Sequence, residues 1–185
     1  EGFYLVGGTA LALQIGHRIS VDFDFFSEKE LSPRLLERVK NAFAGIPLVV
    51  TYRSPEQLNV VIGNVQTTFL FYPYPLIDTS IAWNGIAIAS IHEIAAMKAY
   101  AMGRRLSYKD YVDWYFMLKE NHVHLKDVLA FAEKKFGSEF NDRLFLGQLV
   151  SMEEISEQKI DFLRDETTPH EIREFLKDAV AQFGI

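Results

Sequence analysis

The stretch that decides the fold is GGTALALQIGHRISVDFDFF, residues 7–26. It opens on a glycine pair, continues through a short apolar run, and ends in a strand-like segment that carries two aspartates. On a strand over residues 18–26, Asp22 and Asp24 would share one face about 7 Å apart, with phenylalanines on the other face. Aspartate is a poor strand former, and two neighbouring carboxylates repel each other unless a cation lies between them. This segment therefore predicts a cation-binding site.

The glycine pair precedes a predicted helix. Thr9 is expected to cap a short helix that ends at Gly16. A glycine turn followed by a helix presents free backbone N–H groups and the positive end of the helix dipole, so Gly7, Gly8 and Thr9 are candidates for phosphate binding. Thirteen residues separate Gly8 from Asp22, which is enough for one helix and a return strand that brings the carboxylates beside the glycine turn.

Together, a phosphate cradle and a pair of carboxylates favour an Mg²⁺–nucleotide site and phosphoryl or nucleotidyl transfer. Both features also have structural explanations. Glycine pairs are common at the ends of strands, and acidic residues at a sheet edge oppose aggregation. The edge explanation accounts for one aspartate better than for two, and it leaves the glycines unexplained.

The composition limits the class of protein. At 185 residues the chain forms one domain or two small ones, with enough length for a proper core. Cysteine is absent, so disulfides, thiolate zinc sites and a cysteine nucleophile are excluded, and a reducing cytoplasm is the expected location. No apolar run reaches the ~20 residues of a membrane span. A formal charge of −6 argues against broad electrostatic binding of nucleic acid.

The rest of the chain changes character at residue 90. Before it, an amphipathic helix is expected after Ser32-Pro33, and Gly63-Asn64 predicts a hairpin turn. Strands are expected at 48–53, 58–62, 65–72 and 86–89, with a loop over 73–85. After it, helices are expected at 90–103, 107–121, 125–136 and 139–150, and one more after the capping box Thr168-Pro169-His170-Glu171. The prediction is an α+β fold, with a mixed sheet and flanking helices in residues 1–89 and a helical bundle in residues 90–185.

Charged side chains in apolar surroundings mark further candidate residues. Lys98 lies within a very apolar helical run, so it either extends to solvent or points into a cleft toward a phosphate. Asp110 and Asp113 lie three residues apart on one helical face; Asp110 has capping as its structural alternative, whereas Asp113 has aromatic neighbours. On the predicted strand, Arg18 and Ser20 share the face of the two aspartates, so both are candidates for nucleotide binding. Arg18 is expected to hold a phosphate oxygen or to balance the carboxylates.

The set of motifs resembles a known family. The GGTALAL turn and helix, the HRISVDFDFF strand, AAMKA, and RRLSYKDYVDW are similar to the nucleotidyltransferases of the AbiEii abortive-infection toxins, within the DNA polymerase β-like nucleotidyltransferase superfamily. The resemblance covers roughly residues 3 to 120. It implies that Gly7, Gly8 and Thr9 contact nucleotide phosphates and that Asp22 and Asp24 bind Mg²⁺. The family's later motifs on the helical side would be Lys98, Asp110 and Asp113.

By the same resemblance, the chain would transfer a nucleotide from an NTP to an RNA acceptor, such as a tRNA, or to a protein. It would act as the toxin of a bacterial type IV toxin–antitoxin pair, with a cognate antitoxin as a partner and no membrane partner. One departure matters: related enzymes carry a third carboxylate on a later strand, and Thr68 stands where it is expected here. Asp78, Glu56 or Asp110 could substitute for it, or the chain is a catalytically impaired nucleotide-binding or protein-interaction module with the same fold.

Overall fold

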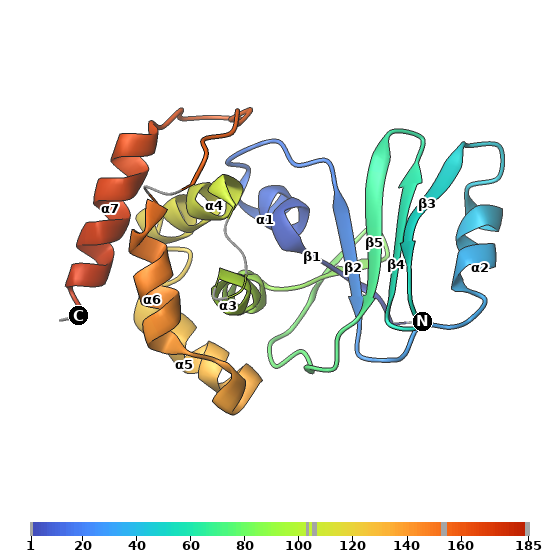
Figure 1. Cartoon of the computed structure of the whole chain (residues 1–185), viewed down its shortest axis with the longest axis horizontal. Coiled ribbons are helices and arrows are strands. Elements are labelled where there is room, and N and C mark those ends of the chain that lie inside the picture. The colour runs from blue at the N-terminus through green and yellow to red at the C-terminus, as the bar shows by residue number, and fades with distance from the viewer. Residues whose placement is uncertain (1, 103, 105–106, 153–154, 184–185) are drawn as a thin grey trace. The chain divides into compact units, whose positions relative to one another are not determined.

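The computed structural model describes residues 2–102, 104, 107–152 and 155–183. The chain forms two compact units, which are described separately below (Figure 1). The first unit comprises Glu1–Ala10 and Ser20–Ala89, and the second comprises Leu11–Ile19 and Ser90–Ile185. The chain passes from the first unit to the second within helix α1 (Gly7–Ile15) and returns between Ile19 and Ser20.

The first unit is built on a mixed seven-stranded sheet with the order β3-β4-β5-β2-β1-β7-β6. Its strands are β1 (Tyr4–Val6), β2 (Phe23–Ser27), β3 (Leu48–Arg53), β4 (Gln57–Ile62), β5 (Val65–Phe71), β6 (Ile81–Trp83) and β7 (Ile86–Ile88). The pairs β1/β7 and β2/β5 are parallel, and the other four pairs are antiparallel. The predicted mixed sheet is confirmed.

Helix α2 (Leu35–Ala42) covers one face of this sheet. Its buried side chains Leu35 and Val39 pack against alternate residues of β4, namely Leu58, Val60 and Ile62. The alternation follows from the pleat of a strand, on which every second side chain points to the same face. The prediction of an amphipathic helix after Ser32-Pro33 is therefore confirmed, and this small core holds β4 and β5 in place beside β2.

Two tight turns join neighbouring strands. Gly63 has a positive φ of 62° in the predicted hairpin between β4 and β5. A second hairpin joins β6 to β7 through Asn84 and Gly85, with positive φ angles of 48° and 80°. Positive φ at both central residues is the requirement of a type I′ turn, for which Asn-Gly is a preferred sequence. The prediction of a loop over 73–85 was wrong in its last part, because this turn pairs β6 with β7.

Strand β2 begins later than expected. It starts at Phe23, so Asp24 lies within the strand and Asp22 directly precedes it, whereas a strand over 18–26 was predicted. Arg18 lies in the second unit, where it forms an isolated bridge with Phe162. The prediction that Arg18 and Ser20 share a strand face with the aspartates is therefore wrong. The alternation of side chains typical of a strand does extend back to Arg18 in the sequence, but the tertiary contacts of Arg18 prevent this residue from joining the strand.

The second unit is helical, as predicted. Its helices are α3 (Ile91–Met102), α4 (Tyr108–Lys119), α5 (Leu125–Phe136), the 3₁₀ turn η1 (Gly137–Glu139), α6 (Asp142–Val150) and α7 (Pro169–Ala181). Helix α3 packs against α5 and α6, and α7 packs against α4 and α6. Helix α4 is central, since Tyr111, Trp114 and Phe116 are almost wholly buried. No helix in the described part of the chain is long and apolar enough to cross a membrane.

The N-terminus of α7 is capped as its sequence predicts. The Thr168 hydroxyl accepts a hydrogen bond from the Glu171 backbone N–H at 3.2 Å. In return, the Glu171 carboxylate accepts one from the Thr168 backbone N–H at 2.8 Å. This reciprocal capping box satisfies two backbone donors that a helix start leaves without partners.

A buried ion pair links α3 to α5. Lys135 Nζ lies 2.8 Å from Glu93 Oε2, and both side chains are fully buried. We expect Lys135→Met to lower the free energy of unfolding by about 3–5 kcal/mol, because it leaves the Glu93 charge buried without its cation. The double variant Glu93→Leu/Lys135→Met should recover most of that loss. Denaturant unfolding measures the stability of the single and the double variant, and Lys134→Met serves as the control at an exposed neighbouring position. An equal loss of stability in Lys135→Met and Lys134→Met would contradict the prediction.

Candidate nucleotide and metal site

The first part of the site is the start of α1. The helix begins at Gly7, two residues earlier than the predicted cap at Thr9. Gly7 has a φ of 73°, a conformation that side chains disfavour. A Cβ at this position would also lie only 2.5 Å from Asp24 Oδ2. Position 7 therefore requires glycine for two reasons: the positive φ disfavours any side chain, and the Asp24 carboxylate occupies the space that a side chain would take.

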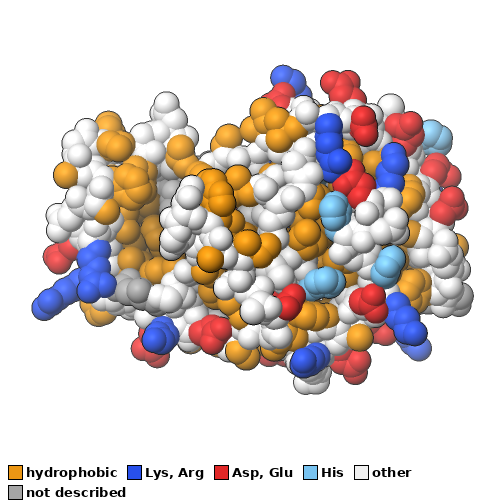
Figure 2. Space-filling view, turned by 180° about the vertical axis from the view of Figure 1, so that it is seen from behind, with side chains coloured by type: hydrophobic (Ala, Val, Ile, Leu, Met, Phe, Trp, Pro, Cys, Tyr) orange, Lys and Arg blue, Asp and Glu red, His pale blue; other side chains and the backbone are white. Residues whose placement is uncertain are grey.

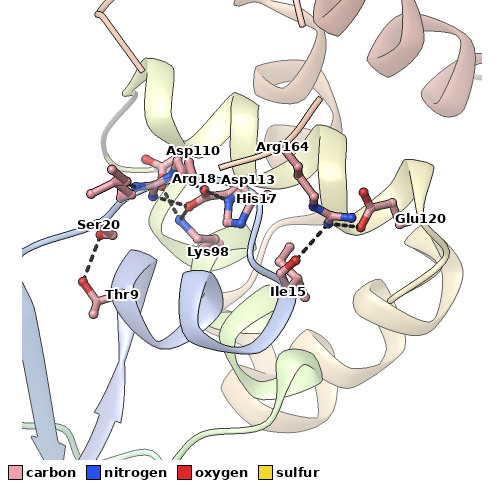
Figure 3. A network of polar contacts seen from close by, with 11 residues as sticks. Thr9, Ile15, His17, Arg18, Ser20, Lys98, Asp110, Asp113, Glu120 and Arg164 are labelled. Atoms are coloured by element: carbon pink, nitrogen blue, oxygen red, sulfur yellow. Dashed lines mark hydrogen bonds and ion pairs between the residues drawn. The ribbon is translucent and has the colours of Figure 1, made fainter. Parts of the chain in front are cut away.

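Thr9 ties the helix to the segment that leads into β2. Its buried hydroxyl lies 2.9 Å from the Ser20 hydroxyl and donates a hydrogen bond to the backbone carbonyl of Asp22 (Figure 3). Because a hydroxyl has one proton, the Ser20 hydroxyl is then the donor to Thr9. These two contacts fix the backbone at Asp22, whose side chain is exposed. The structure thus brings Gly7, Thr9 and both aspartates together within the first unit.

We expect Thr9→Val to lower the free energy of unfolding by about 1–3 kcal/mol, because the Asp22 carbonyl and the Ser20 hydroxyl both lose their partner. Urea unfolding checks this. The matched control is Thr51→Val, whose hydroxyl bonds the Asn59 carbonyl at 3.3 Å in an exposed position. The control should stay within about 0.5 kcal/mol of the wild type. Equal losses of unfolding free energy in the Thr9 and Thr51 variants would show that the Thr9 contacts contribute no more to stability than an exposed hydrogen bond does.

The donor chemistry at Asp22 and Asp24 fits a magnesium ion. Mg²⁺ binds hard oxygen ligands and commonly takes one or two carboxylates, with water and substrate phosphates in its other positions. The described residues contain no group of three or more His, Cys, Asp or Glu side chains that could hold a metal alone. A two-carboxylate site therefore suits a metal that arrives with a phosphate-bearing substrate.

The neighbouring strand supplies no third carboxylate at this level of the sheet. Thr68 on β5 is the direct register partner of Asp24 on β2. On its other side Thr68 pairs with Asn59 of β4. The residues that pair across the sheet from Asp24 thus carry a hydroxyl (Thr68) and an amide (Asn59). Any further acidic group must come from elsewhere in the protein.

A second cluster of charged residues lies in the helical unit. Lys98 of α3 sits 2.7 Å from Asp110 Oδ1 and 2.7 Å from Asp113 Oδ2, both on α4. Arg18 donates to both oxygens of Asp113, from Nε at 2.7 Å and from Nη2 at 3.0 Å. His17 Nε2 lies 2.7 Å from Asp113 Oδ1 (Figure 3). All five side chains are buried.

These contacts keep Asp113 and Lys98 ionised. Burial by itself would raise the pKa of Asp113, but Lys98, His17 and Arg18 outweigh it and hold that pKa far below its usual range. Burial likewise opposes the charge on Lys98, yet Asp113 and Asp110 outweigh it, and the pKa of Lys98 is raised. The lysine is therefore a fixed cation near neutral pH, as a phosphate-binding group must be.

The sequence did not reveal His17 as a member of this cluster. A histidine beside a glycine turn has no partner at helical or strand spacing, and Asp113 lies 96 positions away. The C-terminal segment also holds this part of the chain. Leu163 N–H donates to the His17 carbonyl at 3.1 Å, and Ile19 N–H donates to the Asp161 carbonyl at 2.8 Å. Arg164 donates to the Ile15 carbonyl at 2.9 Å (Figure 3).

Comparison with known proteins places these features in a family. Residues 1–81 match the family described as nucleotidyl transferase AbiEii toxin of a type IV toxin–antitoxin system. The uncharacterized protein aq_aa25 of Aquifex aeolicus is 32% identical over 185 residues, covering 98% of this chain and 87% of that protein.

Two solved structures share the fold at low sequence identity. One is the nucleotidyltransferase toxin MenT4 of Mycobacterium tuberculosis, with a TM-score of 0.68 and 15% identity over 97% of this chain and 74% of that one. The other is a putative nucleotidyltransferase of Helicobacter pylori, with a TM-score of 0.55 and 20% identity over 95% of this chain and 88% of that one. The match over residues 1–81 assigns this part of the chain to the AbiEii family of nucleotidyl transferases.

Proposed function

We propose that this protein is an Mg²⁺-dependent nucleotidyltransferase that moves a nucleotide from an NTP to an RNA or protein acceptor. The observation that carries the proposal is the contact between Gly7 and Asp24. It sets a carboxylate oxygen against the first residue of α1, where backbone N–H groups and the helix dipole attract phosphate. A metal-binding group beside a phosphate cradle is what an Mg²⁺–NTP complex requires.

In this proposal Gly7, Gly8 and Thr9 bind the phosphates, and Asp22 and Asp24 hold the metal. A bound Mg²⁺ would neutralise the phosphate oxygens and favour departure of pyrophosphate. Ser20 acts on the nucleotide indirectly, through its hydrogen bond with Thr9. The chain's own contribution is to hold these groups in place before the nucleotide binds, which is the main source of catalysis in such transfers.

The helical unit contributes Lys98, Asp110 and Asp113 in the same proposal. Lys98 uses two of its three N–H donors on the aspartates, so one remains for a phosphate oxygen. Arg18 itself is committed to Asp113, so we assign it to holding that residue in place of the predicted phosphate contact.

The biological role follows from the family. We propose that the chain acts in the cytoplasm of a bacterium as the toxin of a type IV pair and that a cognate antitoxin restrains it. On the face seen in Figure 2, the described Lys and Arg side chains are scattered among acidic ones and form no continuous basic surface. An RNA acceptor such as a tRNA would then be selected by its end or by local contacts rather than by broad attraction to its backbone.

A second candidate function is a nucleotide-binding or protein-interaction module that has lost catalysis. The specific observation in its favour is Thr68, which pairs with Asp24 at the place where the family resemblance leads us to expect an acid. This candidate predicts tight Mg²⁺–NTP binding without turnover on any acceptor. The first candidate predicts turnover with the same binding.

The test is incubation of the protein with labelled NTPs, Mg²⁺ and bacterial extract. Label should enter RNA or protein, and chelation of the metal with EDTA should stop the transfer. The variant Asp22→Ala/Asp24→Ala should be inactive while remaining folded by circular dichroism. Transfer that survives both the double substitution and EDTA would refute the proposal.

A further inference from the structure

Four side chains form a row across one face of the sheet in the first unit. Asp24 of β2 pairs with Thr68 of β5. Thr68 in turn pairs with Asn59 of β4, and Asn59 pairs with Tyr52 of the edge strand β3 (Figure 1). Directly paired residues place their side chains on the same face of a sheet. The buried residues of β4 that pack under α2 alternate with Asn59, so the row lies on the face opposite to α2 and ends at a proposed metal ligand.

Tyr52 belongs to this row because of a β-bulge. The register between β3 and β4 passes from Val50, which pairs with Val60, directly to Tyr52, which pairs with Asn59, and Thr51 is the extra residue. In a regular ladder Thr51 would pair with Asn59, and the Tyr52 ring would turn to the face that α2 covers. A β-bulge near a functional site commonly redirects one side chain. Here the bulge brings an aromatic ring onto the face of Asp24.

The row offers the groups that bind an unpaired nucleobase. The Tyr52 side chain is 52% exposed, and its ring stacks on no other aromatic ring among the described residues. Gln57 Nε2 donates to Asn59 Oδ1 at 2.9 Å, which leaves both donors of Asn59 Nδ2 without a partner in the described part of the chain. Asparagine is also uncommon in strands. Exposed aromatic rings stack on bases, and polar side chains beside them form hydrogen bonds with the base edges.

The order of the strands assigns this base to the acceptor rather than to the NTP. In the proposed function the NTP phosphates lie at Gly7, which directly follows β1, the neighbour of β2 on one side. The strands β5, β4 and β3 lie on the other side of β2. Asp24 and its metal would thus lie between the phosphates and the row. In phosphoryl transfer the attacking and leaving oxygens lie roughly in line across the phosphorus, so the acceptor approaches from the side opposite to pyrophosphate, where the row lies.

We propose that Tyr52 and Asn59 bind an unpaired base of an RNA acceptor close to its reacting end. The Tyr52 ring stacks on the base, and Asn59 Nδ2 donates to its edge. Thr68 lies between this base and the metal, where its hydroxyl can donate to or accept from the sugar of the acceptor. This inference rests on the proposed nucleotidyl transfer, and it selects RNA over protein as the acceptor.

The first test measures the binding of labelled single-stranded poly-A, poly-C and poly-U RNA by fluorescence anisotropy, without NTP or Mg²⁺. Tyr52→Leu should raise Kd about tenfold, because one base loses its stacking partner, whereas Tyr52→Phe keeps a ring and should stay within about twofold. Trp83→Leu is the matched control, since Trp83 is 50% exposed on β6 at the other edge of the sheet, and it should leave Kd unchanged. The same Kd in Tyr52→Leu and the wild type, or no binding of any of these RNAs by the wild type, would overturn the inference.

Asn59→Asp tests the contact with the base edge. The variant still accepts the hydrogen bond from Gln57, but it replaces the two Nδ2 donors by an acceptor. It should therefore change the order of affinity among the three RNAs. Gln66→Glu adds the same charge at an exposed position on the same face of β5 and should leave that order as it is. An unchanged order in Asn59→Asp would contradict the assigned role of Asn59.

Turnover separates this inference from the proposed function. With an RNA acceptor, Tyr52→Leu should raise the KM for RNA about tenfold and leave kcat and the KM for NTP within about twofold. A rise in the KM for NTP alone would assign the ring to the NTP base and overturn the inference. A chain that binds single-stranded RNA through Tyr52 but transfers nothing contradicts the proposed function alone. A chain whose transfer to its acceptor is unaffected by Tyr52→Leu contradicts the inference alone.

Discussion

Asp24→Asn is expected to lower the rate of nucleotide transfer about 1,000-fold, because the metal's contribution of several kcal/mol is lost and each 1.4 kcal/mol is a factor of ten. The substitution keeps the shape of the side chain that lies against Gly7 and removes its charge. Initial rates at saturating NTP measure the effect. Asp22→Asn should act in the same direction, since both carboxylates are proposed metal ligands.

The control for this prediction is Glu37→Gln, which removes one carboxylate from the exposed side of α2 in the same unit. It should transfer nucleotide at the wild-type rate. If Asp24→Asn retains more than a tenth of wild-type activity, Asp24 is not a metal ligand, and its position against Gly7 has a purely structural purpose.

Gly7→Ala is expected to lower activity about 100-fold, because a displacement of about 1 Å in a reacting assembly costs that much. The new Cβ would lie 2.5 Å from Asp24 Oδ2, so the carboxylate or the start of α1 must move. The φ of 73° adds strain of about 1–2 kcal/mol, which should appear as lower stability. Activity assays and thermal unfolding of the same preparation measure the two effects separately.

Gly63→Ala is the control that separates backbone strain at a positive φ from the steric clash of a new Cβ with a neighbouring side chain. Gly63 has a φ of 62°, but its nearest side-chain neighbour would lie 3.6 Å from the new Cβ, an ordinary contact distance. This variant should lose stability and keep its activity. A Gly7→Ala enzyme that loses stability to the same degree and remains active would contradict the close fit between Gly7 and Asp24.

Features set by neighbouring residues were predictable from the sequence. The bounds of β3, the Gly63-Asn64 turn and the capping box before α7 all follow from backbone rules that act over a few residues. The order of elements and the change to helices after residue 89 follow from hydrophobic periodicity, which is long enough in those segments to identify the element type.

Features set by distant residues were not predictable. Arg18 continues the alternation of the following strand, yet its guanidinium is held by Asp113, 95 positions away. No local pattern records that contact, and burial of an arginine is stable only with such a partner. The same holds for His17. For the aspartates of α4, the sequence indicated a shared helical face, but only the count of donors around each oxygen distinguishes Asp113 from Asp110.

The most direct test of nucleotidyl transfer compares two forms of labelled NTP, one labelled at the α-phosphate and one at the γ-phosphate. The proposed function predicts that α-label enters the RNA or protein acceptor, that γ-label leaves as pyrophosphate, and that Asp22→Asn/Asp24→Asn abolishes both. Entry of γ-label into the acceptor, or its release as inorganic phosphate without α-label transfer, would contradict nucleotidyl transfer.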